Sequence, residues 1–253
     1  IEGQLTANGQ VFLINPSGIL FGQGARVNVG GLVASTLNIR DQDFLTGNYV
    51  FTGTGGTITN HGELNASAGG YLAFVAPGIV NRGNLNAPQG TVALGAGDNV
   101  RLNFAGDRLV SLNVSASRID TLIENHQAIR AAGGAILLTA AAAEGLTNGI
   151  INNTGVLEAS SLTSRGGIIR LEGGLVTNTG TLAVNGTQGG EITVNAMEVR
   201  QGGATSATGT QGVGGTIKLL GDRVALMDAA TVDASGATGG GTVLVGGDYQ
   251  GKN

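Results

Sequence analysis

The chain has 253 residues, of which 41% are hydrophobic and only 12% charged, so it is long enough to bury a core and too apolar to be disordered. Gly accounts for 47 residues and Pro for 3 without a Gly-X-Y period, which excludes collagen and favours a fold with many turns. The net charge of −4 provides no basic face, which disfavours a nucleic-acid partner.

The first distinctive stretch is residues 10–37, where a dense apolar run is interrupted by an Asn-Pro-Ser-Gly tetrapeptide and then resumes. Pro16 fixes φ near the value that the first central position of a turn requires, and Gly18 can adopt a positive φ. Asn15 and Ser17 can hydrogen-bond to their own backbone. Frequent glycines and the predominance of Val, Ile and Phe exclude a long helix on either side. The stretch therefore predicts a strand, a tight turn and a second strand.

Two short patterns recur along the rest of the chain. The first is Asn-x-Gly-x-Leu-x-Ala and its variants, and the second is one or two glycines followed by a short alternating strand. The glycines that precede these strands are Gly70, Gly90, Gly134, Gly167, Gly190, Gly215 and Gly241. Their spacing gives a period in the low twenties if the 44 residues between Gly90 and Gly134 are counted as two turns of 22.

A period of this size, with strands bounded by glycines and no helical i, i+3, i+4 pattern between them, is typical of a β-solenoid. Leucine-rich repeats share the period, but their Leu-x-x-Leu-x-Leu framework followed by Asn is absent. We therefore expect an all-β parallel β-helix in which roughly ten coils, stacked about 4.8 Å apart, form a rod of about 50 Å. A single coil would not be stable, because its few aliphatic side chains do not offset the ordering of its backbone.

An Asn occupies one position of the repeat, before the x-Gly dipeptide, in Asn60, Asn81, Asn153 and Asn178. Such an Asn is either a turn residue or a member of an amide ladder that joins successive coils. We expect one of these structural roles and no ligand role.

Two segments depart from the repeat. In residues 38–54, Asp41 is the expected N-cap of a short helical turn that ends at Gly47, and a strand follows at residues 49–51. Residues 98–114 alternate, turn and alternate again, which predicts a β-hairpin. Both segments are expected to project from the solenoid wall. They would either offer a docking place for a partner or cover an edge or flank of the sheet.

The pattern of residues 119–132 resembles an amphipathic helix, but it also matches the repeat, and we interpret it as a further coil. The alanine run at residues 140–143 is expected to be a connecting loop. A complete strand element at residues 239–247 lies close to the end of the chain. Since a solenoid needs caps at both ends, we expect this chain to be a piece of a longer protein.

No catalytic, cofactor-binding or metal-binding residues are predicted. His61 and His126 occupy the same repeat position in separate coils, and without cysteine they do not complete a zinc site. Disulfides are excluded for the same reason. The longest apolar runs are too short to cross a bilayer, and no signal peptide starts the chain, so an export signal is expected upstream.

Residues 9–37 resemble the haemagglutination-activity, or two-partner secretion, domain of large bacterial exoproteins such as filamentous haemagglutinin. Asn15, Pro16, Ser17, Gly18 and Ile19 match the family's Asn-Pro-Asn-Gly-Ile signature, with Ser replacing the second Asn. The resemblance extends through residues 43–51, 106–114 and 133–140, and the final residues resemble shaft repeats that follow the secretion domain. The family's earlier Asn-Pro-Asn-Leu motif is absent, so the N-terminal part of the domain is expected to be missing.

The resemblance implies a right-handed parallel β-helix that passes through the periplasm and reaches the cell surface or the medium. It implies a cognate outer-membrane transporter whose periplasmic domains recognise the chain. Residues 15–19 are the signature turn and the candidate recognition element. Residues 1–180 would be the secretion domain without its N-terminal part, and residues 181–253 the first shaft repeats.

The leading functional interpretation is therefore the secretion domain of an adhesin or haemagglutinin, which would bind a host-cell or bacterial receptor through the rest of the protein. The alternatives are the same module on a cytolysin or on a contact-dependent toxin. A β-helical polysaccharide lyase is an alternative from another class, and it would need acidic and basic side chains clustered on one sheet.

Overall fold

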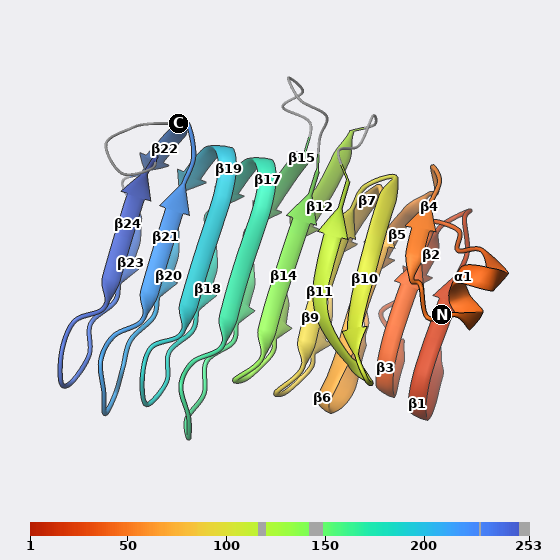
Figure 1. The fold of residues 1–253 in the computed structure, drawn as a ribbon, viewed down its shortest axis with the longest axis horizontal. Coiled ribbons are helices and arrows are strands. Elements are labelled where there is room, and N and C mark those ends of the chain that lie inside the picture. The colour runs from red at the N-terminus through yellow and green to blue at the C-terminus, as the bar shows by residue number, and fades with distance from the viewer. Residues whose placement is uncertain (116–119, 142–148, 228, 248–253) are drawn as a thin grey trace.

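The computed structural model describes residues 1–115, 120–141, 149–227 and 229–247. The chain winds through successive coils whose strands stack in parallel, so the fold is the predicted parallel β-helix (Figure 1). Within those ranges, no helix is both long and apolar enough to span a bilayer.

Three stacks of parallel strands form the wall of the solenoid. Sheet I, at the front of Figure 1, contains nine strands within the described ranges. In stacking order they are β1 (Gln4–Ile14), β3 (Arg26–Ser35), β6 (Glu63–Ala76), β9 (Thr91–Ala96), β14 (Ala135–Ala140), β17 (Ile168–Asn178), β19 (Glu191–Gln201), β21 (Thr216–Leu220) and β24 (Thr242–Gly246).

Sheets II and III complete each coil. Sheet II stacks β2 (Ile19–Phe21), β5 (Thr57–Asn60), β7 (Gly78–Asn81), β12 (Thr121–Asn125), β15 (Gly149–Asn153), the second parts of β17 and β19, and β22 (Arg223–Leu226). Sheet III stacks the first parts of β1, β3 and β6 with β8 (Asn84–Asn86), β13 (Ala128–Arg130), β16 (Val156–Glu158), β18 (Thr181–Ala183), β20 (Ala204–Ser206) and β23 (Thr231–Asp233). The coil predicted at residues 119–132 is confirmed by β12 and β13.

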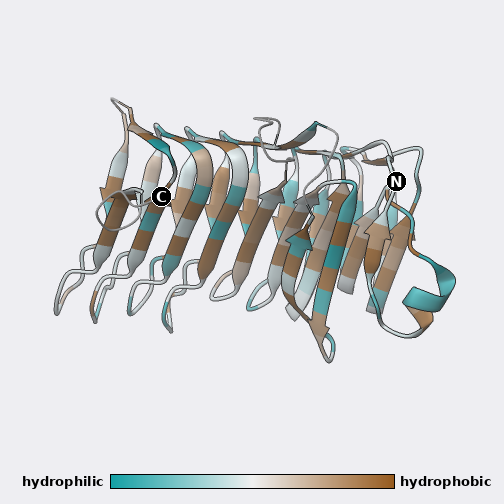
Figure 2. Cartoon of the chain, turned by 45° about the horizontal axis from the view of Figure 1, so that its top comes forward, coloured by the Kyte–Doolittle hydropathy of each residue, from teal (hydrophilic) through white to brown (hydrophobic). Residues whose placement is uncertain are grey.

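The core runs along the inside of the solenoid as rows of aliphatic side chains. Because side chains alternate between the two faces of a strand, one residue in two points inward and meets its equivalent in the next coil. One such row in sheet III consists of Val27, Leu64, Leu85, Ile129, Leu157 and Leu182, all without solvent exposure. Figure 2 shows the resulting apolar bands at similar levels of successive strands.

The prediction that residues 90–134 make two turns is wrong. Strand β9 pairs directly with β14, with Thr91 opposite Ala135 and Ala96 opposite Ala140. The interval is a single coil that contains the hairpin at residues 98–114, which leaves the wall and returns to it. Sequence spacing alone could not separate an insertion from an additional turn.

An amide ladder occupies the predicted Asn position. The Asn60 side-chain nitrogen donates to Asn81 Oδ1, Asn81 donates to Asn125, and Asn125 donates to Asn153, each at 2.8 Å. Asn153 continues the ladder to Asn178 at 2.7 Å, and Asn178 donates to Gln201 Oε1 at 3.1 Å. All six side chains are buried. The ladder interpretation is confirmed, and Asn125 and Gln201 are members in addition to the four predicted ones.

A second layer covers part of sheet I. The predicted hairpin is confirmed as β10 (Asn99–Ala105) and β11 (Arg108–Val114), and β10 also pairs antiparallel with β4 (Val50–Thr52). The two departures from the repeat thus form one three-stranded sheet, here called the cover. Its side chains pack on the outer face of sheet I, so the segments do cover a flank of the sheet.

The residues at 38–54 differ in detail from the expectation. The short helix α1 (Asp41–Leu45) is capped by Arg40, which has extended backbone angles, and no side-chain capping bond is formed. Asp41 is therefore the first helical residue and not the predicted N-cap. The loop predicted at residues 140–143 falls partly outside the described residues, because Ala140 ends β14 and residues 142–148 are not described.

Candidate functional site

The predicted signature turn lies at a corner of the first coil. Residues 15–18 carry the chain from β1 in sheet I to β2 in sheet II. The same corner is extended in later coils, by residues 38–54 between β3 and β5 and by the hairpin between β9 and β12. The turn is thus a short form of the corner that residues 38–54 and the hairpin extend into the cover.

Four backbone atoms and one side chain define the turn. The Gly18 N–H donates to the Asn15 carbonyl oxygen at 3.1 Å, which closes a four-residue turn. Asn15 Nδ2 donates to the Gly18 carbonyl at 2.9 Å, and Asn15 Oδ1 accepts from the Ser17 N–H at 3.3 Å. Gly18 has φ of 124°, in the region that favours glycine. The predicted roles of Asn15 and Gly18 in the turn geometry are therefore present.

The second coil holds the backbone of this turn in place. The Asn15 N–H donates to the Ser35 carbonyl at 2.9 Å, and the Gly56 N–H donates to the Pro16 carbonyl at 2.8 Å. A Cβ on Gly18 would lie 3.3 Å from the Thr57 carbonyl oxygen. The turn conformation consequently depends on the stacking of the second coil on the first.

The side chains of the turn divide into exposed and buried groups. Asn15, Pro16 and Ser17 are exposed, whereas Ile19 is only 7% exposed and packs in the core. Leu20 points outward and is 48% exposed. The structure therefore brings the five predicted residues together but leaves only the first three open to a partner. Leu20 was not predicted, although the alternation of Ile, Leu and Phe after the turn would have indicated its outward orientation.

Charged side chains form pairs on the outer wall in the later coils. Arg170 Nε lies 3.9 Å from Glu172 Oε1, and Lys218 Nζ lies 3.7 Å from Glu191 Oε1, all on the outer face of sheet I. Elsewhere, Glu198 bridges Arg200 at 2.6 Å and Arg223 at 2.8 Å. Acidic and basic groups therefore do share one sheet, as a lyase would require.

The pKa shifts of the carboxyl groups do not favour general acid catalysis. Hydrogen bonds from Arg200 and then Arg223 lower the pKa of Glu198, and hydrogen bonds from the hydroxyl and N–H of Ser235 lower that of Asp233. A general acid of a glycosidase type needs a raised carboxyl pKa, so both shifts have the opposite sign. Burial raises the pKa of Tyr71, whose ring lies beneath the cover.

The surroundings of the two histidines, His61 and His126, do not form a metal-binding site among the described residues. His126 Nδ1 lies 3.0 Å from Thr154 Oγ1 and its Nε2 lies 3.3 Å from Glu124 Oε2. Among the residues that the structure describes, no group of three or more His, Cys, Asp or Glu side chains converges as a metal site would require.

A family model and curated relatives match this chain. The model of the TPS secretion domain family matches residues 1–184. A heme/hemopexin-binding protein of Haemophilus influenzae is 29% identical over 140 residues, which are 52% of this chain and 15% of that protein. A second heme/hemopexin-binding protein of Haemophilus influenzae is 46% identical over 52 residues, or 21% of this chain and 6% of that protein.

A solved structure shares the fold. The HMW1 secretion domain from Haemophilus influenzae superposes with a TM-score of 0.79 at 24% identity, over 95% of this chain and 76% of that chain. The family model covers most of the chain, including the signature turn and the cover, and the resemblance in the sequence is thereby confirmed. The chain therefore belongs to the TPS secretion domain family, the secretion domains of two-partner exoproteins, which have a cognate outer-membrane transporter and pass through the periplasm to the cell surface or the medium.

Proposed function

We propose that the signature turn, Asn15–Ile19, is the element of this secretion domain that the periplasmic domains of its cognate transporter recognise. The supporting observation is that the backbone of the turn is held by hydrogen bonds while three of its side chains are exposed. Its backbone bonds and Gly18 are fixed by the fold, while the side chains of Asn15, Pro16 and Ser17 face solvent at a corner of the first coil. Asn15 and Pro16 also serve the turn conformation, so the same geometry that holds the turn presents these two side chains and Ser17 together to a partner.

The turn also offers an apolar contact to a partner. Leu20 follows Ser17 by three residues on β2 and is half exposed, so we propose that the recognised surface combines the Asn15 amide, the Pro16 ring and the Leu20 side chain. Such a mixture of an apolar anchor and a few polar groups is typical of small recognition surfaces.

We further propose that residues 1–180 form the secretion unit and that residues 181–253 begin the shaft of an adhesin or haemagglutinin that binds a host-cell or bacterial receptor. The support is the resemblance to haemagglutination-activity domains and the regular stacking of β18 to β24. The same module could carry a cytolysin or a contact-dependent toxin. The heme/hemopexin-binding relatives match over 15% and 6% of their lengths, and their ligand is not transferred to this chain.

We also propose that this domain has no catalytic activity of its own. The ion pairs on sheet I engage the charged groups with one another, and the carboxyl groups with shifted pKa values are shifted downward. Incubation with acidic polysaccharides, followed by detection of unsaturated or reducing ends, would reveal a lyase or hydrolase and contradict this proposal.

The recognition proposal is tested by calorimetric titration of the transporter's periplasmic domains with the chain in its folded and its unfolded form. Ser17→Arg places a large charged side chain on the exposed turn without removing a turn hydrogen bond. Gln23→Arg is the matched control, because Gln23 is exposed at the next corner of the same coil. Asn15→Ala removes the two side-chain bonds of the turn, and Gly18→Ala perturbs its backbone.

We expect Ser17→Arg to abolish binding while its urea midpoint stays unchanged, and Gln23→Arg to bind like the natural sequence. If Ser17→Arg and Asn15→Ala both bind normally while Gly18→Ala alone unfolds more easily, the turn has a structural role only. The recognition element would then lie elsewhere in the secretion domain.

A further inference from the structure

The edge of the cover creates a step on the outer face of sheet I. Strand β11 lies over β9, where Gly95 and Gly97 leave room for the side chains of Leu112 and Val114. Among the described residues, no cover strand continues beyond β11 over β14, the next strand along the solenoid, which β11 contacts from one side and whose Leu137 packs against the cover cluster. The step therefore exposes a channel, here called the lane, whose floor is the outer face of β14.

The wall of the lane formed by β11 is an open strand edge. In the cover the order is β11, β10 and β4, so β11 has a partner on one side only. The Ser115 N–H donates to the Asn99 carbonyl at 3.0 Å, and hydrogen bonding alternates along an antiparallel pair. By this alternation Ser111 and Asn113 direct their backbone groups to β10, whereas Leu112 and Val114 direct theirs to the lane.

The start of the same edge is already occupied. The Leu109 carbonyl accepts a hydrogen bond from Thr91 Oγ1 at 2.8 Å, which anchors β11 to sheet I. Within the described residues, no hydrogen bond to the backbone of Leu112 or Val114 from outside the cover is present. An unpaired edge of this kind is a template for a further strand.

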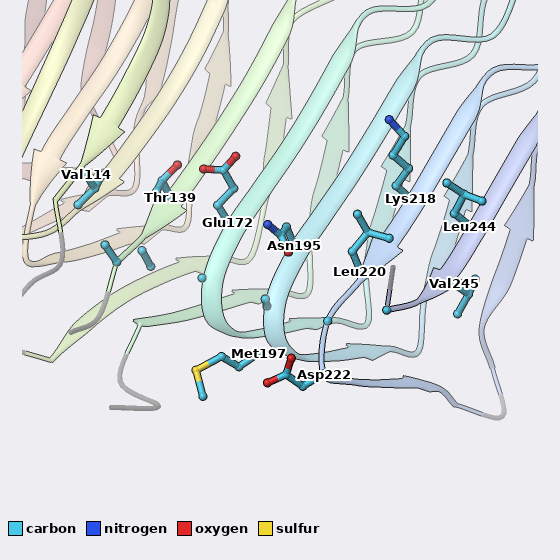
Figure 3. Close-up of a pocket in the computed structure, with 16 residues that line it drawn as sticks. Val114, Thr139, Glu172, Asn195, Met197, Lys218, Leu220, Asp222, Leu244 and Val245 are labelled. Atoms are coloured by element: carbon cyan, nitrogen blue, oxygen red, sulfur yellow. The ribbon is translucent and has the colours of Figure 1, made fainter. Parts of the chain in front are cut away.

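The floor of the lane and the next strand of sheet I, β17, differ in chemistry. Ala135, Leu137 and Thr139 point outward from β14, are partly exposed and carry no charge. On β17 the equivalent positions are Ile168, Arg170 and Glu172. The lane is thus one strand wide, with an uncharged floor between the open backbone edge of β11 and the partly charged outward row of β17, the next strand of the same sheet. Figure 3 shows one end of it, with Val114, Thr139 and Glu172 on neighbouring strands.

Two arginines lie at one end of the lane. Arg108 and Arg165 line the hollow at the end near Gly90 and Gly134, and neither is among the ion pairs of the described residues. Arg165 Nε donates to the Gly189 carbonyl at 3.1 Å, and Glu191, which also lines this hollow, pairs with Lys218 at 3.7 Å. A strand in the lane would therefore be complemented by acidic side chains at this end.

We propose that the lane binds an extended segment of a partner protein as a fourth strand of the cover. The segment has small or β-branched side chains at alternate positions facing Ala135, Leu137 and Thr139, and acidic residues at the end near Arg108 and Arg165. Backbone hydrogen bonds to Leu112 and Val114 supply the attachment, and the uncharged floor and the arginines supply selectivity. The lane is separate from the signature turn, so this site does not depend on the recognition role of that turn.

The probes are two fluorescein-labelled peptides of alternating Val and Thr, one with two Asp residues at its N-terminus and one with them at its C-terminus. Fluorescence anisotropy with the whole chain measures binding, and hydrogen exchange locates it. Leu137→Lys places a charge on the floor of the lane. Thr193→Lys is the matched control, because Thr193 lies in the same outward row two coils further on.

We expect one of the two acidic peptides to bind saturably, with added protection of the Leu112 and Val114 amides. Leu137→Lys and Arg108→Glu should each weaken binding at least about tenfold, while Thr193→Lys changes it less than about twofold. Absence of binding by both peptides, or equal binding by Leu137→Lys, would overturn the proposal. Protection of the same amides that depends on protein concentration without peptide would assign the lane to a second copy of the chain, and would also overturn it.

Discussion

Sheet I has a covered half, β1 to β9, and a largely uncovered half, β14 to β24. Its strands pair in parallel from the first coil to the last, but the side chains on the outer faces of the two halves differ. From the first coil to the last, the central outward row reads Phe12, Val33, Ala73, Ala93, Leu137, Arg170, Thr193, Lys218 and Leu244. The row is apolar as far as the cover extends and becomes mostly polar beyond β14. The inward rows are mainly aliphatic in both halves, with Phe21 and Phe74 stacked in the first coils and the buried amide ladder beside them. The inward residues thus stabilise the solenoid in every coil, whereas the polarity of the outward residues depends on whether the cover packs on them.

The largest effect is expected from removing a buried ring of the cover. Phe51 in β4 is completely buried between the cover and sheet I, and Phe51→Ala should lower the free energy of unfolding by about 3–5 kcal/mol. Leu244→Ala is the control on the uncovered half, where the side chain is 47% exposed, and should change stability far less. Urea unfolding of both variants measures the difference. Equal losses of unfolding free energy in the two variants would show that packing beneath the cover contributes no more stability than an exposed position on the uncovered half.

A second variant tests the amide ladder, which crosses the boundary between the two halves. Asn125→Ala leaves the amide nitrogen of Asn81 and the amide oxygen of Asn153 without their buried partner. We expect a loss of about 2–4 kcal/mol, because each unsatisfied buried polar group is unfavourable by about 1–3 kcal/mol.

The control for the ladder is Asn65→Ala. Asn65 bonds to Asn28 at 3.2 Å and to Asn86 at 3.4 Å on the outer surface, where water can replace the lost partners. Its effect should stay within about 0.5 kcal/mol. A similar loss in both variants would mean that burial of the ladder is not what makes it stabilising.

The sequence predicts those features of this fold that depend on residues close to one another in the chain. The coil period, the Asn ladder and the hairpin at residues 98–114 follow from alternation, repeat position and turn residues, which are local signals. The pairing of β4 with β10 is not local, because it joins segments separated by an entire coil. No residue pattern in either segment specified the other as its partner.

The candidate turn shows the same limit. Its conformation could be predicted, since Pro16 and Gly18 carry their backbone preferences with them. The contacts that fix it, from Gly56 and Ser35 of the second coil, could not be predicted without the coil register. The prediction of two coils in the 44 residues between Gly90 and Gly134 was wrong for the same reason. An insertion and a further coil have similar lengths, and only the strand pairing distinguishes them.

A smaller effect is expected where the cover meets its floor. A Cβ on Gly95 would lie 2.7 Å from Leu112 Cδ1 and 3.1 Å from Val100 Cγ1, so Gly95→Ala should lift the hairpin and destabilise the chain by about 1–2 kcal/mol. Gly240→Ala is the control, because nothing lies within 4 Å of its added Cβ. Hydrogen exchange should accelerate in β10 and β11 of the first variant only. Unchanged hydrogen-exchange rates in β10 and β11 would show that the packing of the hairpin on sheet I does not require a glycine at position 95.

The smallest effect is expected from an exposed pair on the uncovered half of the solenoid. Hydrogen bonds from Arg200 and Arg223 lower the pKa of Glu198 below its ordinary value of 4.5. A lowered folded-state pKa means that the contribution is complete above the unfolded pKa and disappears as the pH falls through the folded pKa. The melting temperature of the natural sequence should therefore exceed that of Glu198→Gln slightly at pH 7, and the two should converge below about pH 4.5. Because the pair is exposed, salt should reduce the difference at neutral pH. A difference that persists in acid or in high salt would mean that Glu198 stabilises the wall by packing instead of by charge.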